Sequence, residues 1–268
     1  MTKRALKRMV REGEFNPGQF EEDNKVRRLP IERGWSPLGG RGGMHGGLHG
    51  GGHGGDEERE QGYLKTIKAK SEGQAALMKA IDERNLVMAL GPAGTGKTYL
   101  AIAKAVEALE AGKVGRIVLS RPAVEAGESI GFLPGEMEDK LAPYLRPLYD
   151  ALSDRLSMKR VRALMAEGAI EIAPVGFMRG RTLNNAFVVI DEAQNCTYGQ
   201  LKMLLTRLGW HSTMVVTGDP NQSDLLPELS GFAQVAEKLD SLADVGVVRL
   251  SDVDIVRHPL VASMLGVL

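Results

Sequence analysis

The sequence predicts an α/β fold in which helices cover both faces of a parallel sheet. Short apolar segments recur along the chain, and segments with helical periodicity separate several of them. The segments that we assign to strands are residues 86–90, 116–120, 170–173, 187–190, 213–217 and 247–250. The clearest helical patterns span residues 99–111, 198–208 and 231–242. Because ligands bind at the carboxyl ends of strands in such sheets, motifs that follow these strands can converge on one site.

The loop after the first strand has the sequence of a phosphate-binding loop, so the expected fold is that of a P-loop NTPase. Residues 91–98 read GPAGTGKT and match the pattern G-x-x-x-x-G-K-[ST]. The glycines let backbone N–H groups approach one anion, and the following helix adds the positive end of its dipole. We expect Lys97 to contact the β- and γ-phosphates and the Thr98 hydroxyl to ligate Mg²⁺. The predicted nucleotide-binding residues of the loop are Gly91, Pro92, Ala93, Gly94, Thr95, Gly96, Lys97 and Thr98.

An acidic pair follows another predicted strand. Residues 187–190 are apolar, and Asp191 and Glu192 come directly after them. This arrangement predicts that Asp191 binds Mg²⁺, normally through its water shell, and that Glu192 is the base that orients and polarises the attacking water. The pair therefore indicates a hydrolase rather than a P-loop kinase of small molecules.

A third polar segment, residues 217–222 (TGDPNQ), ends the strand at 213–217. Gln222 is suited to sense the γ-phosphate, because its amide can both donate and accept. The alternative is a turn closed by residues 218–220, a strong turn signal in its own right. Both interpretations can hold, since the turn would present Gln222 to the nucleotide.

The phosphate loop, residues 191–195 (DEAQN) and residues 217–222 together resemble the PhoH-like proteins, ATPases associated with phosphate starvation. Residues 120–125 (SRPAVE) and 131–135 (GFLPG) also look like this family. The resemblance covers about residues 69–268 and implies a RecA-like core similar to that of superfamily 1 helicases, with ATP and Mg²⁺ as ligands. Residues 1–60 lie outside it.

The resemblance implies further site residues. Gln74 matches the glutamine that recognises adenine in helicase-like proteins; the alternative is an exposed helix residue. Arg257 matches the arginine motif near the family's C-terminus, and Arg121 is another candidate. The chain is expected to be too short for a second RecA-like domain, so we expect a homo-oligomer, by resemblance a hexameric ring. Arg257 would then act in trans on a neighbour's nucleotide, or alternatively in cis on its own.

Composition limits the remaining possibilities. The chain has 34 Lys and Arg against 34 Asp and Glu, so no global charge attracts nucleic acid or membrane. One cysteine, Cys196, and the absence of a long apolar run predict a cytoplasmic protein. We divide the chain into a flexible N-terminal segment, residues 1–62, and an ATPase domain, residues 63–268. The N-terminal segment contains basic residues at 3–11, which form either a solvated tail or a nucleic-acid-binding arm. It also contains a Gly/His-rich stretch at 39–55, which we interpret as a linker, with a metal site as the less favoured alternative.

Two functions follow from these motifs. The first is ATP hydrolysis coupled to RNA remodelling or unwinding, with RNA as partner. The second is a nucleotide-switched regulatory protein, in which ATP changes an interface for a protein partner on residues 121–168 and nucleic acid is not unwound. Few aromatic residues and zero net charge argue against the first.

Overall fold

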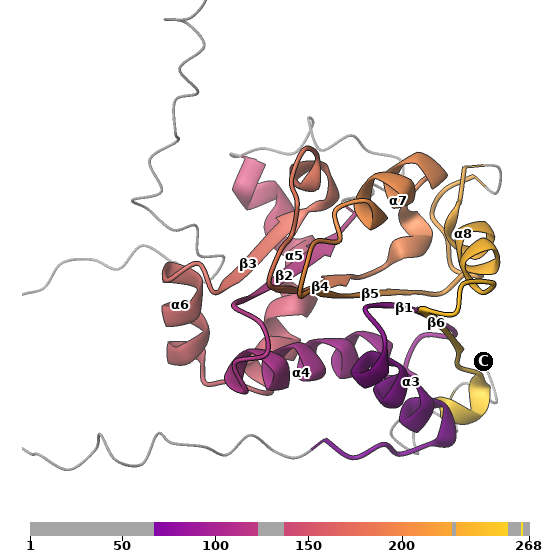
Figure 1. The fold of residues 1–268 in the computed structure, drawn as a ribbon, viewed down its shortest axis with the longest axis horizontal. Helices are drawn as coiled ribbons and strands as arrows, with labels where there is room; N and C mark the ends of the chain where they lie inside the picture. The colour runs from indigo at the N-terminus through magenta and orange to yellow at the C-terminus, as the bar shows by residue number, and fades with distance from the viewer. Residues whose placement is uncertain (1–66, 123–136, 227–228, 257–263, 265–268) are drawn as a thin grey trace, which may run out of the picture. The chain divides into compact units, whose positions relative to one another are not determined.

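The computed structural model describes residues 67–122, 137–226, 229–256 and 264. In these residues six parallel strands form one sheet in the order β3-β2-β4-β5-β1-β6 (Figure 1). The strands are β1 (Leu86–Leu90), β2 (Arg116–Arg121), β3 (Ile170–Pro174), β4 (Ala186–Ile190), β5 (Thr213–Gly218) and β6 (Val245–Arg249). The predicted α/β class with a RecA-like parallel sheet is confirmed. The predicted boundary after residue 62 and the Gly/His-rich stretch lie outside the described residues.

Helices cover both faces of this sheet. Figure 1 shows α3 and α4 on one face and α7 and α8 on the other. The helices are α3 (Glu72–Glu83), α4 (Lys97–Glu110), α5 (Met137–Ser153), α6 (Met158–Ala166), α7 (Tyr198–Leu205) and α8 (Phe232–Leu239), with 3₁₀ turns η2 (Val175–Met178), η3 (Ala193–Asn195) and η4 (Asp252–Asp254). Within the described ranges, no helix combines the length and apolarity needed to cross a membrane.

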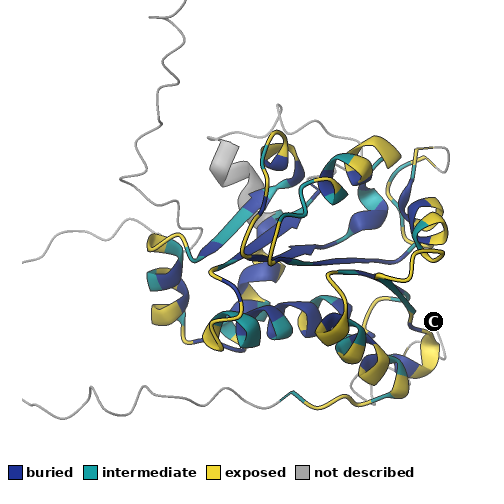
Figure 2. Cartoon of the chain, in the orientation of Figure 1, coloured by how far each residue is buried: buried dark blue, intermediate teal, exposed yellow. Residues whose placement is uncertain are grey.

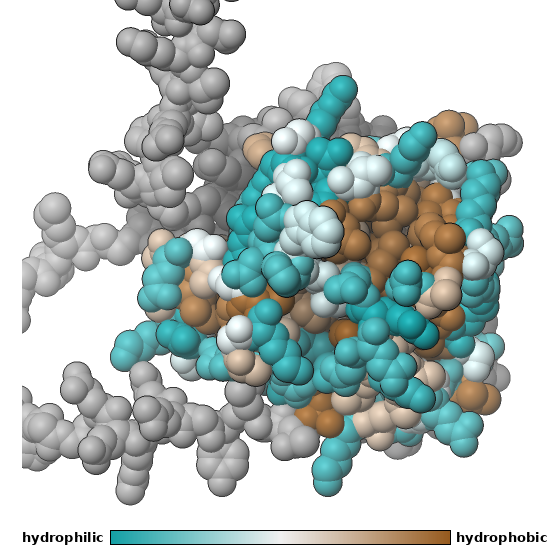
Figure 3. All heavy atoms as spheres, viewed as in Figure 1, coloured by the Kyte–Doolittle hydropathy of each residue, from teal (hydrophilic) through white to brown (hydrophobic). Residues whose placement is uncertain are grey.

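The core lies between the sheet and these helices, as Figure 2 shows by the burial of the strands. Every residue of β4 is buried, which explains why this strand reads as an unbroken apolar run rather than an alternating one. In α5 the side chains of Leu145, Leu148 and Leu152 are buried, so these three residues pack in the core. On the face drawn in Figure 3, apolar side chains gather where Figure 1 places α7 and α8. In these two helices Met203, Leu205 and Leu239 are only half-buried.

The strand order decides which loops meet. β5 lies between β1 and β4, with Leu90 of β1 opposite Gly218 and Ile190 of β4 opposite Val216. Because all three strands are parallel, their carboxyl ends reach the same edge of the sheet. The loops that begin at Gly91, Asp191 and Asp219 therefore lie side by side.

Candidate nucleotide site

The phosphate loop curves between β1 and α4, and two glycines allow it. Gly91 has φ +146°, and a Cβ there would lie 2.4 Å from the carbonyl oxygen of Leu250. Gly96 caps α4 with φ +83°, a left-handed conformation that strains other residues. The loop therefore needs glycine at these positions for backbone reasons as well as for access to a ligand.

Lys97 folds back over the loop. Its ammonium donates to the carbonyl oxygens of Gly91 at 2.6 Å and Pro92 at 2.7 Å, and to Thr95 Oγ1 at 3.3 Å. Burial lowers the pKa of Lys97, against the opposing attraction of nearby carboxylates, of which Asp219 acts most strongly. These three hydrogen-bond partners are neutral oxygens, and phosphate oxygens would be stronger acceptors.

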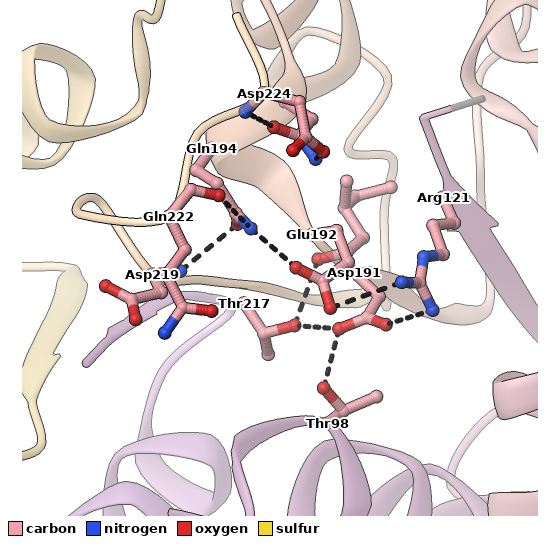
Figure 4. A network of polar contacts seen from close by, with 11 residues as sticks. Thr98, Arg121, Asp191, Glu192, Gln194, Thr217, Asp219, Gln222 and Asp224 are labelled. Carbon is pink, nitrogen blue, oxygen red and sulfur yellow. Dashed lines mark hydrogen bonds and ion pairs between the residues drawn. The ribbon is translucent and has the colours of Figure 1, made fainter. Parts of the chain in front are cut away.

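Asp191 is the centre of a buried polar cluster (Figure 4). Its Oδ1 accepts from the hydroxyls of Thr98 at 2.6 Å and Thr217 at 2.8 Å, and its Oδ2 lies 3.7 Å from an Arg121 nitrogen. Hydroxyl and carboxylate oxygens are ligands that Mg²⁺ accepts, and this ion keeps several waters or phosphate oxygens as well. The fit does not need a carboxylate cluster, and the described residues contain no group of three or more His, Cys, Asp or Glu arranged to hold a metal.

Glu192 is held in an uncommon backbone conformation beside this cluster. Its φ of +53° lies in the left-handed region, which is unfavourable for a residue other than glycine. Arg121 Nη2 lies 3.3 Å from its Oε1, and Gln194 Nε2 donates to its Oε2 at 2.5 Å. The side chain is 37% exposed and lines the cavity, so the carboxylate is oriented yet accessible.

Gln194 links Glu192 to the loop after β5. Its Oε1 accepts from the Asp219 N–H at 3.1 Å, and its Nε2 also lies 3.3 Å from the carbonyl oxygen of Gln222. The Asn221 N–H donates to Asp219 Oδ1, which closes the expected turn, and the turn leaves the Gln222 side chain exposed at the cavity. Sequence reasoning assigned no role to Gln194, although it lies two positions after a named residue.

These groups line one cavity of about 320 Å³. The cavity wall includes phosphate-loop residues, the pair Asp191 and Glu192, and residues 218, 219 and 222. Of the predicted catalytic and metal residues, Lys97, Thr98, Asp191, Glu192 and Gln222 are therefore brought together. Arg257 lies outside the described residues.

The sequence model of the PhoH-like protein family matches residues 66–268. The chain belongs to this family. A PhoH-like protein of Bacillus subtilis is 52% identical over 202 residues, which are 75% of this chain and 63% of that protein. Protein PhoH of Escherichia coli is 45% identical over 197 residues, 72% of this chain and 56% of that protein. The chain thus spans between half and two thirds of the length of these relatives. The large terminase of a thermophilic bacteriophage resembles 73% of the chain and 49% of its own at 12% identity, with a TM-score of 0.43.

Gln74 of this PhoH-like chain packs against the phosphate loop. It is 5% exposed, so the alternative of an exposed helix residue is wrong. Its Nε2 donates to the Thr95 carbonyl oxygen at 3.0 Å, and its Oε1 accepts from the Lys70 N–H at 2.9 Å. Each end of the amide thus already has one partner within the chain, and the adenine contact stays a prediction.

The segment after β6, residues 250–256, runs along the loop and contacts the start of α3. The Leu250 N–H donates to the Leu90 carbonyl oxygen at 2.7 Å, and the Val256 N–H donates to that of Gly94 at 3.0 Å. Between them, Asp254 accepts from the Gly73 N–H at 3.1 Å, and its hydrogen bonds, first of all that with Ser71, lower its pKa. Sequence reasoning missed this segment, which we call the C-terminal strap.

Proposed function

We propose that this PhoH-like chain binds ATP together with Mg²⁺ and hydrolyses it. The observation that carries the proposal is the 2.6 Å contact between the Thr98 hydroxyl and the Asp191 carboxylate, which come from positions 93 residues apart. Lys97 and Glu192 line the same cavity as this pair. A cation for phosphates, oxygen ligands for a hard metal ion and a carboxylate base thus face one volume, as phosphoryl transfer to water requires.

Each of these residues has one proposed role. Lys97 exchanges its backbone carbonyl partners for β- and γ-phosphate oxygens. Thr98 and Asp191 hold Mg²⁺, directly or through water, and the bound ion neutralises charge on the phosphates. Glu192 accepts a proton from water as the water oxygen bonds to the γ-phosphorus. The bond from that phosphorus to the β,γ-bridging oxygen breaks, which releases ADP and inorganic phosphate.

Three glutamines complete the proposal. Gln222, exposed at the cavity, senses the γ-phosphate, and Gln194 connects its backbone to Glu192. Gln74 contacts adenine through the amide N–H and the oxygen lone pair that its hydrogen bonds to Thr95 and Lys70 leave unused. ATP rather than GTP would then be the preferred nucleotide.

Two substitutions test the proposal. Lys97→Ala should abolish useful ATP binding, measured with a fluorescent ATP analogue, while Lys113→Ala, which removes an exposed lysine outside the cavity, should bind normally. Glu192→Gln should bind ATP normally and lower turnover by about 10²–10⁴-fold, because it removes the general base. Normal turnover by Glu192→Gln would show that Glu192 does not activate the water.

We further propose that hydrolysis is coupled to RNA remodelling. A titration of ATPase activity against single-stranded RNA, DNA and no nucleic acid tests this, and stimulation should weaken steeply with salt. A nucleotide-switched regulatory protein would instead show no response to either polymer and would capture a protein partner only with ATP bound.

We also propose that the working form is a homo-oligomer, by family resemblance a hexameric ring. Among the residues that line the described cavity, Lys97 is the single cation, and an arginine supplied in trans accelerates hydrolysis by about 10³–10⁵-fold. Mixing inactive Lys97→Ala and Arg257→Ala subunits tests this, because the first can donate Arg257 to the intact phosphate loop of the second. Recovered activity supports action in trans, and a fully active monomer in sedimentation would exclude it.

A further inference from the structure

Arg121 contacts Asp191 and Glu192 from the strand beside β4 that lies away from the phosphate loop. It ends β2, which lies next to β4, whereas β5 and then β1 lie on the other side of β4. Arg121 is absent from the wall of the described cavity. The nucleotide and Arg121 therefore flank Asp191 and Glu192 in the order of the strands.

The Arg121 guanidinium occupies one of the two oxygens of Glu192. Its Nη2 lies 3.3 Å from Oε1, and Gln194 takes Oε2, so both oxygens of the proposed base have a donor. Figure 4 shows the two donors on opposite sides of the carboxylate. The attacking water must share an oxygen with one of them, and Arg121 carries the full charge. The ion pair between Arg121 and Glu192 thus restrains the proposed base in the state that the structure describes.

The same guanidinium can accept another anion. It is 22% exposed, and its second contact, Nη1 to Asp191 Oδ2, is a longer 3.7 Å ion pair. Mg²⁺ at Asp191 would weaken this contact further by repulsion between cations. A guanidinium presents several N–H donors in a fork that matches phosphate geometry. A phosphate is therefore a suitable competitor for the carboxylates.

We infer that Arg121 is a second phosphate-binding group, which exchanges Glu192 for a phosphodiester of single-stranded nucleic acid and thereby releases the base for the attacking water. This inference rests on the proposed ATP hydrolysis and names the group through which RNA acts on it. Nucleic acid is the ligand that repeats phosphates along a chain, and because Arg121 does not line the nucleotide cavity, such a chain would not have to enter that cavity to contact it. No covalent bond changes in the exchange; one ion pair replaces another.

Arg121→Gln tests the inference, with Arg116→Gln as the matched control. Arg116 starts the same strand, and its side chain donates to the Asn184 carbonyl oxygen at 3.4 Å, away from the acidic pair. Arg121→Gln should raise turnover without nucleic acid by about two- to fivefold, the effect of losing one partly exposed ion pair. Single-stranded RNA should no longer stimulate it. Arg116→Gln should match the wild type in both assays, and ATP affinity should stay unchanged in both variants.

The outcomes separate this inference from the proposed function. Lower turnover of Arg121→Gln without RNA, at unchanged ATP affinity, would overturn it, because Arg121 would then assist Glu192 instead of restraining it. Stimulation of Arg121→Gln by RNA as in the wild type would also overturn it, while ATP hydrolysis and RNA coupling would stand. Equal stimulation of the wild type by inorganic phosphate, at the same phosphate concentration, would exclude nucleic acid as the required ligand.

A second variant keeps the test valid if Arg121→Gln folds poorly. Arg121→Lys retains a cation beside the carboxylates but loses the guanidinium fork. It should keep the low turnover of the wild type without RNA and respond to RNA more weakly. Turnover that is already raised in Arg121→Lys would contradict the restraint by charge.

Discussion

Replacing Gly91 by alanine should separate the phosphate loop from the C-terminal strap. The added Cβ would lie 2.4 Å from the Leu250 carbonyl oxygen, closer than the 3.0 Å that real Cβ atoms keep. The two backbones must therefore move apart by about 0.6 Å, the difference between these values. The movement strains the hydrogen bond from the Leu250 N–H to Leu90, which joins the start of the strap to the end of β1.

The expected loss of stability is the sum of two effects. Forcing an L-residue into φ +146° costs about 1–3 kcal/mol, and a weakened backbone hydrogen bond costs about 1 kcal/mol. Gly91→Ala should therefore lower the free energy of unfolding by about 2–4 kcal/mol. At about 2–4 °C per kcal/mol for a domain of this size, the melting temperature should fall by about 5–15 °C.

Gly112→Ala is the matched control, because Gly112 also has positive φ, +67°, but its Cβ would meet nothing within 4 Å. Its strain of about 1–2 kcal/mol is partly offset by about 0.4–1 kcal/mol from the less flexible unfolded chain. Thermal and urea unfolding of both variants, with ATP affinity as a second measurement, compare the positions. Equal losses of stability, with unchanged ATP affinity for Gly91→Ala, would refute the argument that the strap supports the loop.

Two further predictions concern single polar contacts. Thr217→Val should lower the free energy of unfolding by about 1.5–3 kcal/mol and reduce ATP turnover, because the buried carboxylate of Asp191 loses a hydroxyl donor. Urea unfolding measures the loss of stability, and Thr213→Val, at the other end of β5, is the control. Asp254→Asn should destabilise the protein at pH 7, and its difference from the wild type in urea midpoint should shrink as the pH falls below 3.8. The folded pKa of Asp254 is lowered, so its stabilisation is present above the unfolded pKa and is lost as the carboxylate is protonated; a difference that grows in acid would contradict this.

The sequence predicted the phosphate loop and the polar segments well because each follows an apolar strand. Such motifs are recognised from adjacent residues alone, and in the structure the loop residues, the acidic pair and Gln222 all lie at the same edge of the sheet. The helix after the loop was also predicted, although it begins at Lys97 rather than Tyr99. Parallel strands guarantee the common edge, so convergence needed no knowledge of strand order.

Contacts that depend on strand order could not be predicted in the same way. Arg121 reaches Glu192 only because β2 lies next to β4, and nothing local in residues 116–121 indicates this neighbour. The C-terminal strap binds the loop through backbone groups, which leave no side-chain signature. The single available signal was the spacing of Ser251 and Asp254, which form a capping box around η4. Gln194 carried no periodic signal of its own.

The phosphate loop therefore depends on two segments that are distant in sequence. Gln74 of α3 holds the loop through Thr95, and the strap holds it through Gly94. Asp254 joins these two supports, because it belongs to the strap and accepts from Gly73 of α3. A polyphosphate that draws Lys97 away from the loop carbonyls changes contacts beside both supports at once. We therefore expect nucleotide binding to be coupled to the position of α3 and of the strap. Gly73→Ala, whose added Cβ would lie 2.5 Å from Asp254 Oδ1, should weaken that coupling before it unfolds the sheet.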